Sequence, residues 1–230
     1  DEALLDGRID FAVHSLKDLP FALPEGTALS AVTERGDARD ALVSNGTGLR
    51  EMPQGARIGT SSLRRQAQLR HRFPALEVLP LRGNVDTRLA KLDSGEFEGI
   101  ILAAAGLIRL GHQARITQYL DRDVMISAVG QGALGLVCRG EDTEMYRTLQ
   151  VLDDPDSHDA IVAERALMAS LEGSCQVPVA GYAHFEGDEI VLEGMIASLD
   201  GTKVLADTVR GDRSNPSFNN SWVELLVYVT

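Results

Sequence analysis

Residues 56–91, ARIGTSSLRRQAQLRHRFPALEVLPLRGNVDTRLAK, decide the fold that we predict for this chain. Strand-like apolar runs alternate here with helix-like runs, and the pattern continues just beyond the stretch. In chain order the runs are 56–60, 62–72, 76–81, 85–95 and 98–105. Strands that alternate with helices are typical of right-handed crossovers and a mostly parallel sheet. The sequence therefore predicts an α/β lobe centred on this stretch.

The same stretch is basic, with eight Arg and Lys residues against Glu77 and Asp86, in a protein of net charge −12. Several arginines stand where a strand is expected to turn into a helix. They are Arg64, Arg65, Arg82 and Arg88. Arginine at a helix start is electrostatically unfavourable unless an anion meets it, and helix N-termini are themselves anion sites. The junctions therefore predict binding of an extended polyanion, although a run of arginines can also be a solvated face. We expect the latter for Arg70, His71 and Arg72.

Composition limits the kind of protein that this chain forms. Its 230 residues and 44% hydrophobic content suit one large or two to three small domains. An acidic chain with one basic patch favours a small anionic ligand over nonspecific binding of nucleic acid, which needs a broad positive surface. Two cysteines do not make a disulfide framework, and the five histidines have no metal-ligand spacing. No apolar run is long enough to predict a membrane span.

The N-terminal part predicts a second lobe. The apolar run 9–16 is typical of a parallel strand that is buried on both faces, and Lys17 and Asp18 follow its carboxyl end, where α/β sheets place ligands. Residues 27–32 predict another strand, and residues 34–44 predict a crossing to the other lobe that ends in a short strand.

The middle of the chain predicts a return to this first lobe. Residues 107–111 and 114–120 are helix-like. Residues 125–140 contain two strand-like pieces around a glycine pair at 130 and 132, whose lack of side chains permits close backbone approach.

The C-terminal part changes character after a turn-rich boundary at residues 153–156. An amphipathic helix is expected over 158–173. Three strands separated by hairpin-type breaks are then expected over 177–185, 189–198 and 203–210. This pattern predicts a small α+β domain with an antiparallel sheet.

Two residue types can carry chemistry. Asp18 is the best candidate for an acid or base, although an Asp after a strand also commonly caps a helix, and Lys17 can be its ion partner. Cys138 lies in an apolar strand and is expected to be a buried core thiol. Cys175 lies in a loop of small residues that leaves its thiol accessible, so it is either reactive or unremarkable.

Five segments resemble the signatures of the porphobilinogen deaminase (hydroxymethylbilane synthase) family, in the family's order and spacing. They are HSLKDLP (14–20), GTSSLRRQAQL (59–69), LRGNVDTRLAKLD (81–93), AVGQGALG (128–135) and LEGSCQVP (171–178). The resemblance covers residues 1–210. It implies an α/β fold of two lobes like those of periplasmic binding proteins, plus a small α+β C-terminal domain with an antiparallel sheet. In this chain the partial first lobe would be 1–34 with 125–143, the second 37–121, and the C-terminal domain 155–230.

The resemblance also implies an activity and a cofactor. The family condenses four porphobilinogen molecules into the linear tetrapyrrole hydroxymethylbilane, with release of ammonia, in porphyrin and heme biosynthesis. Its dipyrromethane cofactor is attached by a thioether to a cysteine that matches Cys175. Asp18 matches the catalytic aspartate, which assists loss of ammonia and stabilises the azafulvenium cation. No metal is implied.

The matched binding positions are numerous. Those expected to hold the cofactor, besides Cys175, are Lys17, Thr60, Ser61, Ser62, Arg64, Arg65, Arg82, Gly83 and Arg88. Arg35 and Arg109 match positions expected to bind substrate. These assignments suit the charge pattern, because each pyrrole carries acetate and propionate groups that arginine binds through paired hydrogen bonds.

Further expectations concern the state of the protein. The resemblance implies a cytoplasmic monomer, with an organelle stroma or matrix left open, that works without nucleic acid or membrane. The chain lacks the family's first strand, helix and lid-like loop, and residues 211–230 do not resemble its final helix. We therefore expect the 230 residues alone to be catalytically inactive. The alternative from another class is a non-catalytic two-lobed binder of a small polyanion, in which Asp18 and Cys175 are structural.

Overall fold

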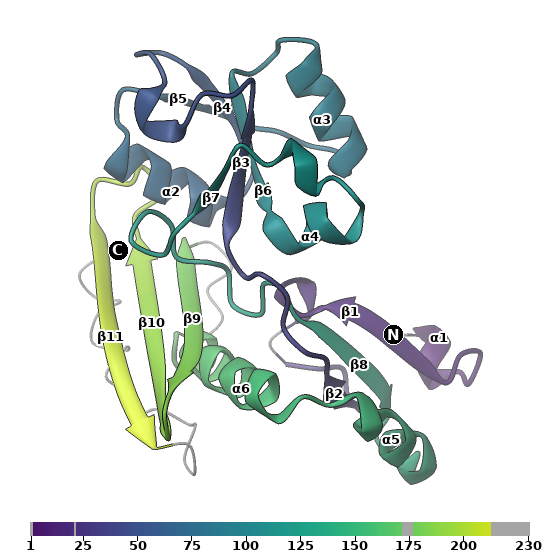
Figure 1. Cartoon of the computed structure of the whole chain (residues 1–230). Coiled ribbons are helices and arrows are strands. Elements are labelled where there is room, and N and C mark those ends of the chain that lie inside the picture. The colour runs from purple at the N-terminus through teal and green to yellow at the C-terminus, as the bar shows by residue number, and fades with distance from the viewer. Residues whose placement is uncertain (1, 21, 172–176, 213–230) are drawn as a thin grey trace.

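The computed structural model describes residues 2–20, 22–171 and 177–212 and contains three β-sheets (Figure 1). One three-stranded sheet lies near the N-terminus, a five-stranded sheet follows, and a second three-stranded sheet lies toward the C-terminus. The expected α/β fold with a C-terminal antiparallel sheet is confirmed. No helix in the described ranges has the length and apolar character that a membrane crossing requires.

The first sheet has the strand order β1-β8-β2. Its elements and their neighbours are α1 (Glu2–Leu5), β1 (Phe11–Ser15), η1 (Leu16–Asp18), β2 (Thr27–Val32), β8 (Leu134–Arg139), α5 (Thr143–Leu149) and η4 (Gln150–Leu152). The chain leaves this sheet after β2 and comes back at β8, so the predicted return to the first lobe is confirmed.

The prediction for β1 was wrong in its pairing and its burial. The strand runs antiparallel to β8 at the edge of the sheet, and the side chains of Phe11 and Val13 are 42% and 54% exposed. Its apolar run resembles that of a buried parallel strand, and sequence alone does not distinguish the two.

The five-stranded sheet has the order β5-β4-β6-β3-β7. Its elements are β3 (Asp40–Ser44), η2 (Leu49–Glu51), β4 (Arg57–Gly59), α2 (Leu63–Arg72), β5 (Glu77–Leu79), α3 (Val85–Asp93), β6 (Gly99–Ala103), α4 (Ala104–Arg109), η3 (Gln113–Arg115) and β7 (Gln118–Leu120). The predicted alternation gives parallel pairing of β4 with β5 and β6, while β3 is antiparallel to β6 and β7.

Helices cover both faces of this sheet. On one face Ile100 and Leu102 of β6 pack with Leu89 of α3 and Leu107 of α4. On the other face Ile101 packs with apolar residues of α2 and of the chain after β7. Burial on both faces explains why these strands are continuous apolar runs.

Two predictions in the middle of the chain were wrong. Residues 114–120 form a 3₁₀ turn and strand β7 instead of a helix, and only one strand, β8, forms within 125–140. Residues 125–133 instead form a loop that packs closely against the crossing between the lobes, residues 34–39, which we call the hinge. Gly130 and Gly132 in this loop have φ of 74° and 93°. Helix α5 was not predicted, because its seven residues are too few for a clear period.

The C-terminal sheet is antiparallel in the order β11-β10-β9 and packs against one long helix. The elements are α6 (Pro155–Ser170), β9 (Val179–Glu186), β10 (Glu189–Ala197) and β11 (Val204–Asp212). Asp154 caps α6 by accepting from Ser157 N at 2.8 Å, ahead of Pro155 in the first turn.

The basic end of α2 is exposed or half-exposed, as predicted, and it also contacts this C-terminal sheet. Arg70 Nη1 donates to Leu199 O at 2.7 Å, and His71 Nδ1 lies 3.2 Å from Gly201 O. A Cβ at Gly201 would lie 2.6 Å from Ala67 O, so the turn between β10 and β11 sits directly on the helix. Arg72 is exposed, as predicted.

We expect amide exchange to differ sharply between the two lobes. Residues 11–18 form an edge strand, which has exposed apolar side chains, and the turn after it. Residues 58–102 include the strands β4 and β6 of a sheet that is covered on both faces. Hydrogen–deuterium exchange followed by mass spectrometry should therefore show fast exchange in the first segment and slow exchange in β4 and β6. Equal protection of the two segments would contradict this expectation.

Candidate active site

A pocket of about 360 Å³ lies where the first lobe faces the second. Its lining residues are Lys17, Asp18, Ser61, Ser62, Arg64, Arg65, Arg88, Ala128 and Gln131. Lys17 and Asp18 come from η1 at the end of β1, and the others come from the β4–α2 junction, from α3 and from the chain before β8. The structure thus brings the candidate acid together with three of the four junction arginines.

The two strand-to-helix junctions are joined by one hydroxyl group. Ser61 Oγ donates to Leu81 O at 2.9 Å and accepts from Leu81 N at 3.0 Å. Ser62 is the N-cap of α2 and Asn84 is the N-cap of α3. The two junctions therefore lie side by side, and Ser61 contributes to this placement structurally.

Two other predicted residues at the junctions have structural roles in the backbone. Thr60 is buried, and its Oγ1 accepts from Ser62 N at 3.3 Å. Gly83 has φ of 120°, and a Cβ there would lie 2.7 Å from Thr87 Cγ2, so only glycine fits without a shift. Arg88 Nε donates to Gly83 O at 2.8 Å, and this bond holds the Arg88 guanidinium group beside the pocket.

The junction arginines Arg64 and Arg65 already meet an anion, Asp40 at the start of β3. Arg64 Nη1 lies 2.6 Å from Asp40 Oδ2, and Arg65 Nε lies 2.9 Å from Oδ1. Asp40 is fully buried, which would raise the pKa of its carboxyl group, but the two guanidinium groups outweigh burial and hold that pKa far below its usual range. The pKa of the Arg65 guanidinium group is lowered, and burial is the largest cause.

Lys17 and Asp18 stand at the open side of the pocket. Although water reaches the Lys17 side chain, desolvation by the surrounding protein lowers the pKa of its ammonium group, the charge of Arg65 lowers it further, and Asp18 opposes both. The turn that carries both residues is held from behind, since Leu16 N donates to Ala133 O at 3.1 Å. A Cβ at Gly130 would lie 2.8 Å from the carbonyl carbon of Leu16.

The remaining predicted residues lie outside this pocket. Arg82 is exposed beside Gly83. Arg109 Nη2 donates to Gly132 O at 2.7 Å. Arg35 forms an ion pair with buried Glu164 at 2.5 Å and lines a different cavity. Cys175 is outside the described residues, and Cys138 is fully buried in β8, as its apolar strand predicted.

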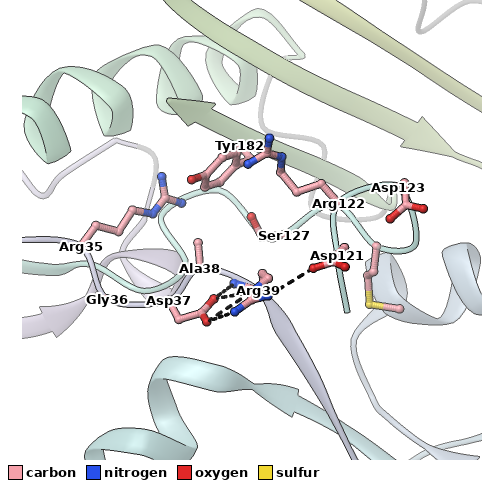
Figure 2. Close-up of a pocket in the computed structure, with 11 residues that line it drawn as sticks. Arg35, Gly36, Asp37, Ala38, Arg39, Asp121, Arg122, Asp123, Ser127 and Tyr182 are labelled. Atoms are coloured by element: carbon pink, nitrogen blue, oxygen red, sulfur yellow. Dashed lines mark hydrogen bonds and ion pairs between the residues drawn. The ribbon is translucent and has the colours of Figure 1, made fainter. Parts of the chain in front are cut away.

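A larger cavity, about 720 Å³, is lined by the lobe crossing at residues 35–39 and is the weaker candidate (Figure 2). Its arginines are already paired with acids: Arg39 with Asp37 and Asp121, and Arg122 with Glu193. Arg35 and Arg122 also stack on the ring of Tyr182 at 4.8 Å and 4.9 Å from its centroid. In the smaller pocket Arg64 and Arg65 are paired too, with Asp40, but of the two cavities it is the one that brings the candidate acid Asp18 together with four basic residues, so we assign the active site there.

Sequence reasoning missed three buried polar residues that support the pocket. Asp40 binds the arginines, Gln131 Nε2 donates to Asp40 Oδ1 at 3.0 Å, and Glu164 pairs with Arg35. A weak signal existed for Asp40, which directly precedes an apolar strand, and for Glu164, which interrupts the apolar face of α6. Neither signal identifies a partner, because those partners come from distant parts of the chain.

The fold and the pocket define a class of protein: two α/β lobes that place one carboxylate opposite a cluster of basic side chains suited to a polycarboxylate ligand. Residues 1–147 match the family model described as porphobilinogen deaminase, dipyromethane cofactor binding domain, and residues 159–217 match that of the porphobilinogen deaminase C-terminal domain. The chain belongs to the porphobilinogen deaminase family.

Individual relatives agree with this assignment. The chain is 52% identical to a porphobilinogen deaminase of Roseiflexus sp. and 50% identical to one of Nostoc sp., over 94% and 92% of its own length. It spans 71% and 67% of those two relatives, and 66% of a 50% identical relative from Geobacter sulfurreducens. The fold of the periplasmic aliphatic sulphonate binding protein of Escherichia coli matches 75% of the chain and 57% of that protein with a TM-score of 0.43 and 13% identity.

The pocket fits the cofactor that the family model names. A dipyrromethane carries carboxylate side chains, and the described lining offers Lys17, Arg64, Arg65 and Arg88 as cationic donors. Arg64 Nε is buried without a hydrogen-bond partner among the described residues. Such a donor is expected where a ligand, or a small shift of the lobes, supplies the missing acceptor.

Proposed function

We propose that the protein of which this chain is part condenses four porphobilinogen molecules into hydroxymethylbilane and releases ammonia at each step. Membership of the family supports this reaction, and one structural observation carries it: Asp18 shares a pocket with four basic side chains. The family acts on porphobilinogen, a small molecule. The alternative, a non-catalytic binder, is not favoured, because relatives at about 50% identity over most of the chain are deaminases.

Asp18 is the catalytic residue in this proposal. Its carboxyl group gives a proton to the departing amine, and the carboxylate that remains stabilises the positive charge that develops on the aminomethyl carbon of porphobilinogen. Lys17 lies beside it, and its ammonium group and the Asp18 carboxylate attract each other. The two residues sit on the rigid turn η1, which limits their motion during the step.

The basic residues hold and orient carboxylates. Arg64, Arg65 and Arg88 meet the acetate and propionate groups, with Arg82 and Gly83 beside them on the α3 junction. Thr60, Ser61 and Ser62 shape the α2 junction and contribute donors. Contact of Arg35 or Arg109 with porphobilinogen requires a lobe arrangement different from this one, since both are bonded at the hinge.

The dipyrromethane supplies the pyrrole position onto which the first porphobilinogen is added, and we propose that Cys175 anchors it through a thioether. In the chain Cys175 comes after α6 and before β9, so the C-terminal unit, 155–230, would carry the anchor. The other units of the proposal are 1–34 with 125–143 and 37–121.

A mass measurement tests the anchor. A thioether survives reductants, so the cofactor-loaded protein should show an added mass after thiol treatment that maps to the peptide containing residues 173–176. Cys175→Ser should lack the added mass, whereas the matched control Cys138→Ser should keep it and lose only packing energy, about 1 kcal/mol. An adduct on Cys138 would refute the assignment.

We also propose that the protein acts in the cytoplasm as a monomer, without nucleic acid or membrane. Its bacterial relatives support the location, and the net charge of −12 opposes attraction to phosphate backbones. Sedimentation of the purified protein at several concentrations tests the oligomeric state: a single species at the mass of one chain is expected.

A further inference from the structure

Asp40 stands behind both arginines of the pocket and holds them at the same time. It opens β3 and is fully buried. Its Oδ2 accepts from Arg64 Nη1 at 2.6 Å, and its Oδ1 accepts from Arg65 Nε at 2.9 Å and from Gln131 Nε2 at 3.0 Å. All three donor residues line the pocket, whereas Asp40 itself does not.

Backbone carbonyl groups complete the anchoring of the two guanidinium groups. Arg64 Nη1 also donates to Ile126 O at 2.6 Å, and Arg65 Nη1 donates to Ile101 O at 2.9 Å. Arg65 Nη2 also lies 2.7 Å from Asp40 Oδ1, so Arg65 is held through all three of its nitrogens, and Arg64 is held through the two N–H groups of Nη1. Because a guanidinium group is a rigid plane, two fixed donors determine the direction of the remaining ones.

Charge gives Asp40 a second effect on the pair. Arg64 and Arg65 are neighbours with like charge, both nearly buried, and each disfavours the other. The Asp40 carboxylate compensates one of the two charges, and the low pKa that the arginines impose keeps it ionised at every working pH. Without it, two uncompensated cations would separate or turn toward any other anion within reach.

We infer that Asp40 is a positioning residue for the reaction: it sets the orientation of Arg64 and Arg65 so that their free donors meet the carboxylates of the pyrrole ligands. This inference rests on the proposed function. Asp40 has no contact with the ligand in this role and acts only through the two arginines.

The competing explanation is a purely structural ion pair in the core, and ligand-dependent measurements separate the two. A structural role predicts lower stability with unchanged KM and kcat in the folded fraction. A positioning role predicts a higher KM, since carboxylate recognition is lost before chemistry is. It also predicts that porphobilinogen protects an Asp40 variant less than the wild type against heat, because stabilisation by a ligand falls as its Kd rises.

The experiment compares Asp40→Asn, Asp40→Glu and the wild type in full-length, cofactor-loaded protein. Asp37→Asn is the matched control, since Asp37 lies three residues earlier and pairs with the half-exposed Arg39. We expect Asp40→Asn to raise KM for porphobilinogen by about tenfold or more, and to lower kcat less than KM rises. Asp40→Glu should recover part of the loss, and Asp37→Asn should stay within about twofold.

A second measurement reports on the arginines directly and covers the case in which Asp40→Asn loads no cofactor or folds poorly. In labelled Asp40→Glu and wild-type protein, NMR should show a slowly exchanging Nε–H for Arg65 in the wild type and faster exchange in the variant. Unchanged KM in Asp40→Asn, or unchanged Arg65 exchange in Asp40→Glu, overturns the inference. If the wild type does not consume porphobilinogen, the proposed function fails, and the exchange measurement then decides whether Asp40 orients the arginine.

Discussion

Asp18→Ala will lower the turnover of porphobilinogen by about 10³-fold or more while leaving the fold and cofactor loading intact. The loss combines a missing proton-transfer group, worth about 10² to 10⁴, with missing stabilisation of a developing positive charge. The side chain is exposed at the pocket mouth, so its removal opens no core cavity. Steady-state assays of ammonia release, with intact mass to verify loading, measure the effect.

Two controls make this expectation specific to the position of the carboxylate. Asp6→Ala removes an exposed acid of the same lobe that pairs with exposed Arg8, and it should leave turnover unchanged. Asp18→Asn keeps the size of the side chain and removes its charge and basicity, so it should resemble Asp18→Ala. Turnover within tenfold of the wild type in either Asp18 variant would remove Asp18 from the catalytic role.

The sequence predicted the parts of the fold whose pattern is local. The strands and helices of the stretch 56–105 were predicted in the correct order, because the spacing of apolar residues identifies each element and a polar turn ends it. The three C-terminal strands followed from hairpin breaks at Gly187 and Gly201, which have φ of 64° and 74°. In both regions the same apolar residues identify the element in the sequence and are buried when it packs.

The errors arose where tertiary contacts decide the local structure. Residues 118–120 form β7 because they pair with β3, which is more than seventy residues earlier in the chain. Residues 125–133 form a loop because they approach Leu16 and Ala38 too closely for a regular strand. Arg70 and His71 contact a turn near residue 200. Helical period and charge contain no information about such distant partners.

The candidate site divides in the same way. Its pocket residues were predictable because strand ends, polar turns and family signatures lie close together in the sequence, and seven of them meet in the pocket. The charges behind them were not predictable: Asp40 pairs with residues 24 and 25 positions later, and Glu164 with a residue 129 positions earlier. Buried ion pairs have no sequence period, so the residues that orient a site are harder to find than those that line it.

Glu164→Ala will destabilise the protein by about 3–5 kcal/mol, a large part of the roughly 5–15 kcal/mol that holds a domain folded. Glu164 is fully buried in α6, and its two oxygens accept from Arg35, from Gly130 N at 2.7 Å and from Ala183 N at 2.8 Å. Its removal leaves a nearly buried guanidinium group and two backbone donors without their acceptor, which costs more than the lost contacts. Urea unfolding of variant and wild type measures the change.

The matched control is Glu186→Ala, which breaks the exposed pair with Arg210 in the sheet that packs on α6 and should leave the stability nearly unchanged. Replacing both Arg35 and Glu164 with apolar residues should recover part of the loss, because no charge is then left buried. Since Gly130 N is held by Glu164, and Gly130 touches the backbone of Leu16 and Lys17, Glu164→Ala should also lower turnover in the fraction that stays folded. Equal stability losses for Glu164→Ala and Glu186→Ala would show that the buried carboxylate does not link α6, the hinge and the turn that carries Asp18.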